Sequence, residues 1–178
     1  AVAIAPLSTQ AASAGDLIKM DGLSSVYYLG EDGKRYVFPN QKTYNTHFAN
    51  FDGVVTVSEA ELVSYPIGGN VCYREGTKMV KITTDPAVYA VEPGCVLRHV
   101  DSEARAIKLF GSNWNQQIED VPDSFFVNYT VGSPISSDMH PAGSLIKYDG
   151  DSTVYRVDSD GTKRPIADQA AMDANRFW

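Results

Sequence analysis

The chain has 178 residues, of which 43% are hydrophobic, and it carries a formal net charge of −7. This length fits one domain or two small ones, and the hydrophobic content is that of a globular chain rather than a disordered one. Phosphate binding needs clustered Lys and Arg, and no basic run occurs, so we expect no nucleic-acid partner. No apolar stretch reaches about 18 residues, which argues against a membrane span.

The first 14 residues, AVAIAPLSTQAASA, form an apolar segment without side-chain charge. They are interpreted either as the start of a mature secreted chain or as the remnant of a secretion signal. Val2, Ile4 and Leu7 stand at alternate or near-alternate positions. We expect this arm to lie on its own fold or on a neighbouring copy of the chain, by adding a strand to an exposed sheet edge.

A pattern of three short strands joined by tight turns occurs three times along the chain. The expected strands cover residues 17–19, 26–29 and 35–38, then 79–81, 88–91 and 97–100, then 145–147, 154–157 and 163–166. A Val-Tyr pair opens each middle strand, and successive pairs lie 62 and 66 residues apart. We expect these pairs to form the core of each unit, at Val26, Tyr27, Val88, Tyr89, Val154 and Tyr155.

Turn residues between the second and third strands support an antiparallel meander in each copy. Asp32-Gly33 and Asp160-Gly161 are strong hairpin signals, because Gly adopts the positive φ that tight turns require. Pro93-Gly94 replaces them in the second copy.

A short helix is expected after each meander. The clearest is Ser102–Phe110, with Gly111 as its C-cap, and the others cover 41–48 and 169–178. The repeat continues further, because residues 57–68 match residues 121–132 at a constant offset of 64. Ser58 with Glu61 predicts a capping box at the start of a second helix.

The sequence therefore predicts an α+β, β-rich fold made of tandem small units. Each unit is a three-stranded antiparallel meander followed by one or two short helices. The expected boundaries are an N-terminal arm at 1–14, unit 1 at 15–75, unit 2 at 76–133, a linker at 134–142 and a truncated unit 3 at 143–178. Units of about 60 residues are marginal alone, so neighbouring units are expected to pack together.

Several runs resemble a repeat found in secreted and surface-attached proteins of candidate-phyla bacteria. The resemblance is carried by VYYLG at 26–30, DGKRYVFPN at 32–40, KITTDPAVYAVEPG at 81–94 and VPDSFFVNY at 121–129. It covers roughly residues 15–133 and, more loosely, 143–178. The resemblance implies export and a place at the cell surface, and it implies no reaction.

The two cysteines, Cys72 and Cys95, both lie in or beside the second unit. A disulfide, two buried thiols, and a metal-binding or reactive thiol are the three interpretations. A disulfide would imply an oxidising, extracellular compartment.

Other side chains give weak signals for chemistry. Acidic turn residues in the third unit suit either hairpin turns or a calcium loop: Asp149, Asp151, Asp158 and Asp160. His47, His99 and His140 show no metal-ligand spacing, and no nucleophile or phosphate-loop motif occurs. We therefore expect no catalytic residue, no metal and no cofactor. Asn128 lies in an Asn-x-Thr triplet, which is either a glycosylation acceptor or a chance match.

The ten tyrosines and two tryptophans suit either core packing or stacking on sugars. The sequence favours a non-enzymatic secreted structural protein that associates with copies of itself into an extracellular filament or surface lattice. The alternative is a module that binds cell-wall or surface glycan and anchors a larger protein.

Overall fold

The computed structural model describes residues 11–177, which form a strand-rich α+β fold. These residues contain three β-sheets and five short α-helices, in agreement with the fold class expected from the sequence. Contacts divide the described chain into a first unit of residues 11–41 and 50–71 and a second unit of residues 42–49 and 72–177. Residues 42–49 and 72–75 fall inside the first unit expected from the sequence, but their contacts are with the second.

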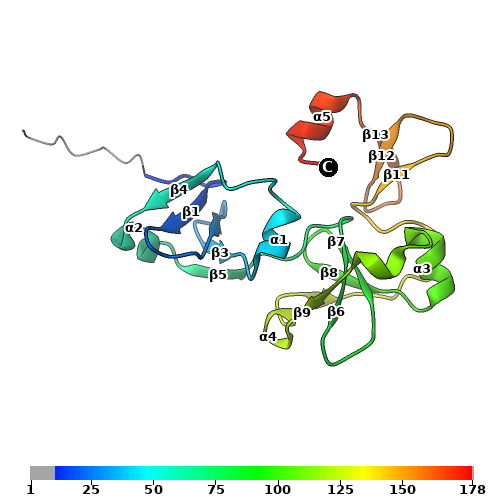
Figure 1. Ribbon diagram of the computed structural model, residues 1–178, viewed down its shortest axis with the longest axis horizontal. Helices are drawn as coiled ribbons and strands as arrows, with labels where there is room; N and C mark the ends of the chain where they lie inside the picture. Colours follow the sequence, from blue (N-terminus) through cyan, green and yellow to red (C-terminus); the bar gives the residue numbers. More distant parts are fainter. Residues whose placement is uncertain (1–10, 178) are drawn as a thin grey trace, which may run out of the picture. The chain divides into compact units, whose positions relative to one another are not determined.

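The first unit contains one five-stranded sheet (Figure 1). Its strands are β1 (Leu17–Met20), β2 (Tyr27–Leu29), β3 (Arg35–Val37), β4 (Val54–Val57) and β5 (Ile67–Asn70). Strands β1, β2 and β3 form the antiparallel meander predicted from the sequence. Strand β4 pairs in parallel with β1, and β5 pairs in parallel with β3, so β4 and β5 are the outer strands.

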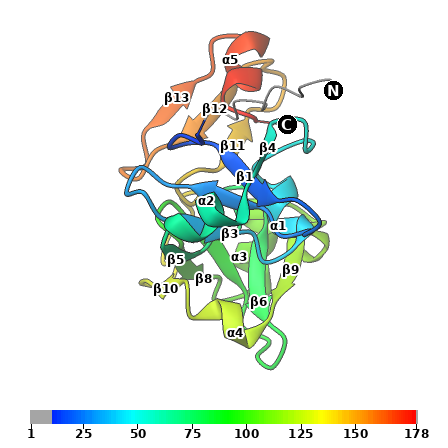
Figure 2. The same cartoon turned by 90° about the vertical axis from the view of Figure 1, so that its left-hand side faces the viewer.

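Helix α2 (Glu59–Ser64) lies in the first unit (Figure 2). Its first turn is bonded to Ala12, near the end of the N-terminal arm. The Ser58 hydroxyl accepts from the Glu61 N–H at 3.1 Å, as expected for an N-cap. The second half of the predicted capping box does not form. Instead of returning to Ser58, the Glu61 carboxylate accepts from the Ala12 N–H at 2.8 Å and from the Tyr65 hydroxyl at 3.3 Å.

The second unit contains a five-stranded sheet with the same connectivity as the first. Its strands are β6 (Met79–Ile82), β7 (Tyr89–Glu92), β8 (Val96–His99), β9 (Ile118–Val121) and β10 (Thr130–Val131). Strands β6, β7 and β8 form an antiparallel meander, β9 pairs in parallel with β6, and β10 pairs in parallel with β8. Advancing the strand numbers of the first sheet by five therefore reproduces the order of the second.

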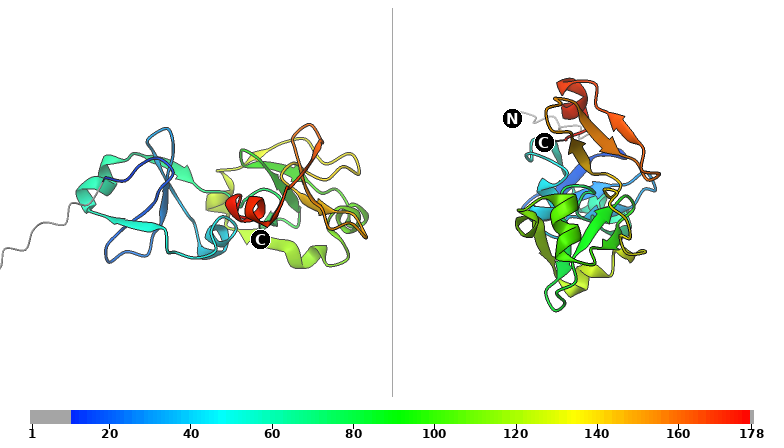
Figure 3. Two further views of the ribbon diagram at one scale, coloured as in Figure 1. Left: turned by 90° about the horizontal axis from the view of Figure 1, so that it is seen from above. Right: turned by 90° about the vertical axis from the view of Figure 1, so that its right-hand side faces the viewer.

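Four helical segments accompany these sheets: α1 (Gln41–Asn45), α3 (Glu103–Phe110), the 3-10 helix η1 (Trp114–Gln117) and α4 (Asp123–Phe126). The third sheet, orange in Figure 3, consists of β11 (Leu145–Lys147), β12 (Val154–Val157) and β13 (Lys163–Pro165). It is antiparallel throughout and is followed by α5 (Gln169–Ala174).

The three meanders share their register and a backbone bond at their entrance. In each, the middle-strand tyrosine faces the same two positions: Tyr27 faces Ile18 and Val37, Tyr89 faces Val80 and His99, and Tyr155 faces Ile146 and Pro165. A glycine with positive φ precedes each first strand and donates its N–H to the second strand: Gly15 to Leu29, Gly76 to Val91 and Gly143 to Val157. The sequence analysis did not identify these glycines.

The core of the second unit occupies both faces of its sheet, because alternate residues of a strand point to opposite faces. On one face, Met79 and Ala90 pack with Ala106 and Leu109 of α3. Ile135 joins this core, so the segment expected to be a linker at 134–142 contributes a buried side chain. The other face is covered by a second buried cluster: Tyr73, Val80, Val91, Leu97 and Val121.

Gly76 and Gly143 approach each other more closely than a side chain allows. A Cβ on Gly76 would lie 2.2 Å from the Gly143 carbonyl oxygen. Gly22 has nearly the same φ, +73° against +71°, but a Cβ there would meet nothing within 4 Å. We expect Gly22→Ala to cost about 1–2 kcal/mol for its left-handed backbone. Gly76→Ala should cost roughly a further 1–3 kcal/mol for the steric clash. Denaturant unfolding of both variants measures the difference, and equal losses would show that the approach is not tight.

Candidate functional site

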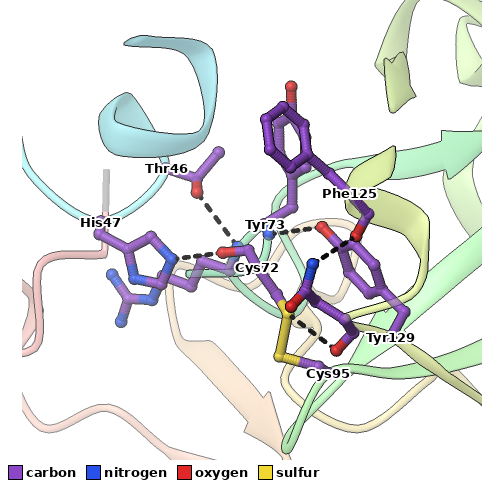
Figure 4. The surroundings of a disulfide bond; sticks show 9 residues. Thr46, His47, Cys72, Tyr73, Cys95, Phe125 and Tyr129 are labelled. Atoms are coloured by element: carbon purple, nitrogen blue, oxygen red, sulfur yellow. Dashed lines mark hydrogen bonds between the residues drawn. A yellow bond between two sulfur atoms is a disulfide. The ribbon is translucent and has the colours of Figure 1, made fainter. Parts of the chain in front are cut away.

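Cys72 and Cys95 form a disulfide, with their sulfur atoms 2.09 Å apart and their Cα atoms 5.9 Å apart (Figure 4). Of the three interpretations of the cysteines, the structure therefore supports the first. The bridge links the segment before β6 to the turn between β7 and β8, 23 residues further along the chain. A bridge closing a loop of this length stabilises a fold by roughly 3 kcal/mol.

The turn after α1 is bonded to the residues beside this disulfide. His47 Nε2 lies 2.9 Å from the carbonyl oxygen of Cys72, and since a carbonyl only accepts, Nε2 carries the proton. The Thr46 hydroxyl accepts from the N–H of Arg74 at 3.1 Å. These two bonds give a local reason why residues 42–49 group with the second unit.

The disulfide also lies near Tyr73, Phe125 and Tyr129 (Figure 4). The Tyr129 hydroxyl accepts from the N–H of Tyr73 at 2.9 Å, and burial raises the pKa of Tyr129 to about 12. Asn128 Nδ2 donates to the carbonyl of Phe125 at 3.1 Å. Cys72 Sγ lies 3.8 Å from the Asn128 carbonyl, which is a packing contact because a disulfide sulfur has no hydrogen to donate. The disulfide thus lies among hydrogen-bonded residues, and neither of its cysteines is a free thiol.

The acidic residues of the third meander serve its turns. Asp151 accepts from the Thr153 N–H at 2.8 Å and Asp160 from the Thr162 N–H at 2.9 Å, and these bonds hold the pKa of each carboxyl below its usual value. Asp158 pairs with Arg164 and Arg156. Within residues 11–177, no group of three or more His, Cys, Asp or Glu side chains is arranged to hold a metal ion.

The remaining predicted site residues are placed as follows. Val26 is buried, and the other five residues of the expected repeat core are half-buried: Tyr27, Val88, Tyr89, Val154 and Tyr155. The arm residues lie outside the described part of the chain: Val2, Ile4 and Leu7. The ring of His99 packs 5.4 Å from that of Tyr89, centroid to centroid.

Two apolar positions are exposed at equivalent places in the two five-stranded units. In the first unit, Val63 near the end of α2 is 63% exposed and Ile67 at the start of β5 is 67% exposed. In the second unit, Val127 after α4 is 80% exposed and Val131 in β10 is 58% exposed. Each residue of the second pair lies 64 positions after its counterpart in the first. We call these two pairs the repeated apolar patches.

The outer strands of the two sheets differ in charge. Strand β9 carries Glu119 and Asp120, whose carboxylates pair with Lys42 at 2.6 Å and with Lys81 at 2.5 Å. Charged side chains of this kind discourage further strands from adding to an edge. Strands β4, β5 and β10 have the sequences VVTV, IGGN and TV, without a charged residue. These three outer strands therefore lack the charged side chains that β9 carries.

A cavity of about 450 Å³ lies within the second unit. It is formed by the end of α1, the residues between the disulfide and β6, the start of the third meander and the residues after α5. Its charged lining residues are Arg74, Glu75, Lys78 and Arg176. Nothing in the sequence places these residues together, since Arg74 and Arg176 are about a hundred positions apart.

Cys95 has a positive φ of 62°, a conformation in which glycine is more stable than other residues. Removing the disulfide should therefore cost less when glycine replaces Cys95. We expect Cys72→Ala/Cys95→Gly to be more stable than Cys72→Ala/Cys95→Ala by about 1 kcal/mol. Denaturant unfolding of the two double variants tests this, and equal stability would mean that the backbone relaxes once the bridge is gone.

Burial lowers the pKa of His47, and the bond to the Cys72 carbonyl raises it. Burial has the larger effect, so the pKa of His47 lies below its ordinary value of 6.5. The folded protein thus binds a proton at His47 less readily than the unfolded chain does. The stability contributed by the neutral ring is present above pH 6.5 and is lost as the pH falls below it. We expect His47→Gln, which can still donate to the carbonyl, to lose less stability than the wild type between pH 7 and about pH 5. Parallel pH dependences in denaturant unfolding would contradict this.

Within the described residues, no helix is both long and apolar enough to cross a membrane. A comparison of the chain with models of known protein families and with curated proteins finds no match. Function therefore has to be inferred from the geometry of the chain itself.

Proposed function

We propose that this protein is a non-enzymatic secreted structural protein whose copies associate into an extracellular filament or surface lattice. The observation that carries the proposal is the pair of repeated apolar patches, at Val63 with Ile67 and at Val127 with Val131. Burying such a side chain contributes about 1.5–3 kcal/mol. A chain that exposes the same apolar pair in two successive units offers two similar surfaces to neighbouring copies.

Tandem repetition of one unit underlies this proposal. The shared strand order of the two five-stranded sheets supports two complete copies, and the register of β11, β12 and β13 supports a third, partial copy. The resemblance to repeats of surface-attached bacterial proteins agrees with this interpretation. A contact that one unit makes can then be made again by the next.

The N-terminal arm supplies a strand in this proposal. Val2 and Ile4 alternate with alanines up to Pro6, which lacks an N–H and so suits the end of a short strand. Such a strand would add to an uncharged edge, at β4, β5 or β10, of a neighbouring copy. A strand that one copy donates to an edge of the next would make a head-to-tail contact, and such contacts give filaments when they do not close.

An extracellular location follows from the same proposal. The Cys72–Cys95 disulfide supports an oxidising compartment, because such bridges are rare in the reducing cytosol. The resemblance to exported repeats supports the cell surface.

Glycan binding is the second candidate function. Exposed aromatic stripes give it little support, since the most exposed aromatic residues within residues 11–177 are Phe51 and Tyr148, at 47% and 49%. The charged cavity beside Arg74 is the observation that favours it.

Two changes should prevent assembly without unfolding the chain. Deleting residues 1–10 removes the proposed strand but keeps the Ala12 bonds to Glu61 and Tyr65. The double variant Ile67→Lys/Val131→Lys places a charge in each repeated apolar patch. Because each patch would lose apolar burial, the concentration needed for assembly should rise more than about tenfold.

Sedimentation velocity over a range of concentrations, with negative-stain images, measures this effect. Ile107→Lys is the matched control, because Ile107 is 45% exposed on α3 and belongs to neither patch. Wild-type and control chains should assemble alike. A wild-type chain that stays monomeric would refute self-association. Variants that assemble as the wild type does would refute the role of the arm and of the repeated apolar patches.

A further inference from the structure

The cavity in the second unit has a strongly positive wall on an acidic chain. Three cationic side chains line it, from Arg74, Lys78 and Arg176, against one carboxylate, from Glu75. Glu75 is already paired with Arg156, whose Nη2 lies 3.2 Å from Oε1. Among the described residues, no carboxylate lies within salt-bridge distance of the three lining cations. The described lining residues therefore carry more positive than negative charge.

Arg74 is held by backbone carbonyls and a ring instead of an acid. Its guanidinium donates to the carbonyl oxygens of Arg176 and Asn175 at 2.5 and 2.6 Å, and lies 4.8 Å from the centroid of the Phe177 ring. These carbonyls follow the last turn of α5, where helix carbonyls lack intrahelical partners. Burial lowers the pKa of Arg74. The Glu75 carboxylate acts on Arg74 in the opposite direction but is not within ion-pair distance of it, so a partly buried cation here favours binding of an anion.

Arg176 occupies a backbone position that normally belongs to glycine. Its φ is +54°, and the bonds from Phe177 N to Met172 O and from Arg176 N to Asp173 O close a Schellman motif. The Arg176 guanidinium lies 4.6 Å from the centroid of the Phe48 ring. An arginine here costs stability that glycine would not, because its backbone is left-handed.

The rest of the lining suits a hydroxyl-rich ligand. Asn45, Thr46, Thr77 and Phe177 also line the cavity. The Thr46 and Thr77 hydroxyls donate to the carbonyls of Thr43 and Arg74, so toward a ligand they can act only as acceptors. The volume of about 450 Å³ is within the range of small-molecule sites. Sugar rings combine hydroxyl groups with apolar C–H faces, so these residue types fit a saccharide.

We propose that this cavity binds an acidic saccharide, with the carboxylate of a hexuronate residue placed between Arg74, Lys78 and Arg176. The inference rests on the second candidate function, glycan binding, and is independent of self-association. The Arg176 guanidinium suits a carboxylate because it can donate two parallel hydrogen bonds to it, whereas Arg74, already bonded to two carbonyls, contributes mainly its charge.

Calorimetric titration of the full chain with trigalacturonate tests the proposal, with neutral maltotriose and inorganic phosphate as comparison ligands. Trigalacturonate should bind, with an affinity that falls as salt is added, and maltotriose should bind at least about tenfold more weakly. Equal binding of inorganic phosphate would overturn the saccharide assignment. Equal binding of maltotriose would leave glycan binding standing and overturn the cationic site. No binding of either saccharide would count against both.

Two variants locate the ligand. Lys78→Gln and Arg176→Gly should each weaken trigalacturonate binding about tenfold, as expected for loss of a charged hydrogen-bond donor. Glycine also relieves the positive φ at position 176, so this variant should unfold at no lower denaturant concentration than the wild type. Lys108→Gln makes the same charge change as Lys78→Gln outside the cavity, where Lys108 pairs with Asp138, and should leave binding unchanged. Unaltered binding by the Lys78 and Arg176 variants would place the ligand elsewhere.

Discussion

The outer strands of two small sheets set the main physical constraint on this chain. A five-stranded sheet covers its faces with its own helices and loops, but its edges retain backbone groups that can pair with another strand. In the described chain β9 is guarded by the charged side chains of Glu119 and Asp120, whereas β4, β5 and β10 carry no charge. The repeated apolar patches include Ile67 of β5 and Val131 of β10. Edge pairing and apolar burial therefore favour contacts at the same places.

Internal restraints make such contacts compatible with a stable fold. The second unit is held by the Cys72–Cys95 disulfide, by the close approach of Gly76 to Gly143, and by the bond from His47 to the Cys72 carbonyl. None of these restraints involves the residues of the repeated apolar patches. The residues that line the cavity are not those of β4, β5 or β10, so the proposed glycan binding and the proposed self-association would use different residues of the same chain.

Local signals in the sequence predicted the antiparallel meanders. They could not predict which strands pair when the strands are far apart in the sequence. Asp32-Gly33 and the alternation around Tyr27 depend on neighbouring residues, so the strands β2 and β3 could be predicted. Strand β5 has the sequence IGGN and pairs in parallel with β3, about 30 residues earlier, and two adjacent glycines give no strand signal. The Ser58 half of the predicted capping box was confirmed. The Glu61 half was wrong, because Glu61 bonds to Ala12, which no local pattern indicates. The cavity could not be predicted, because its lining includes residues as far apart in the sequence as Arg74 and Arg176.

Self-association through the uncharged edges is the central claim, and amide hydrogen exchange at two protein concentrations tests it most directly. The account predicts that raising the concentration slows exchange in residues 63–70 and 127–132, the segments that hold the repeated apolar patches and strands β5 and β10. Exchange in β7, at the centre of its sheet, should not change. Identical exchange at both concentrations in these edge segments, from a sample that images show to be assembled, would contradict the account.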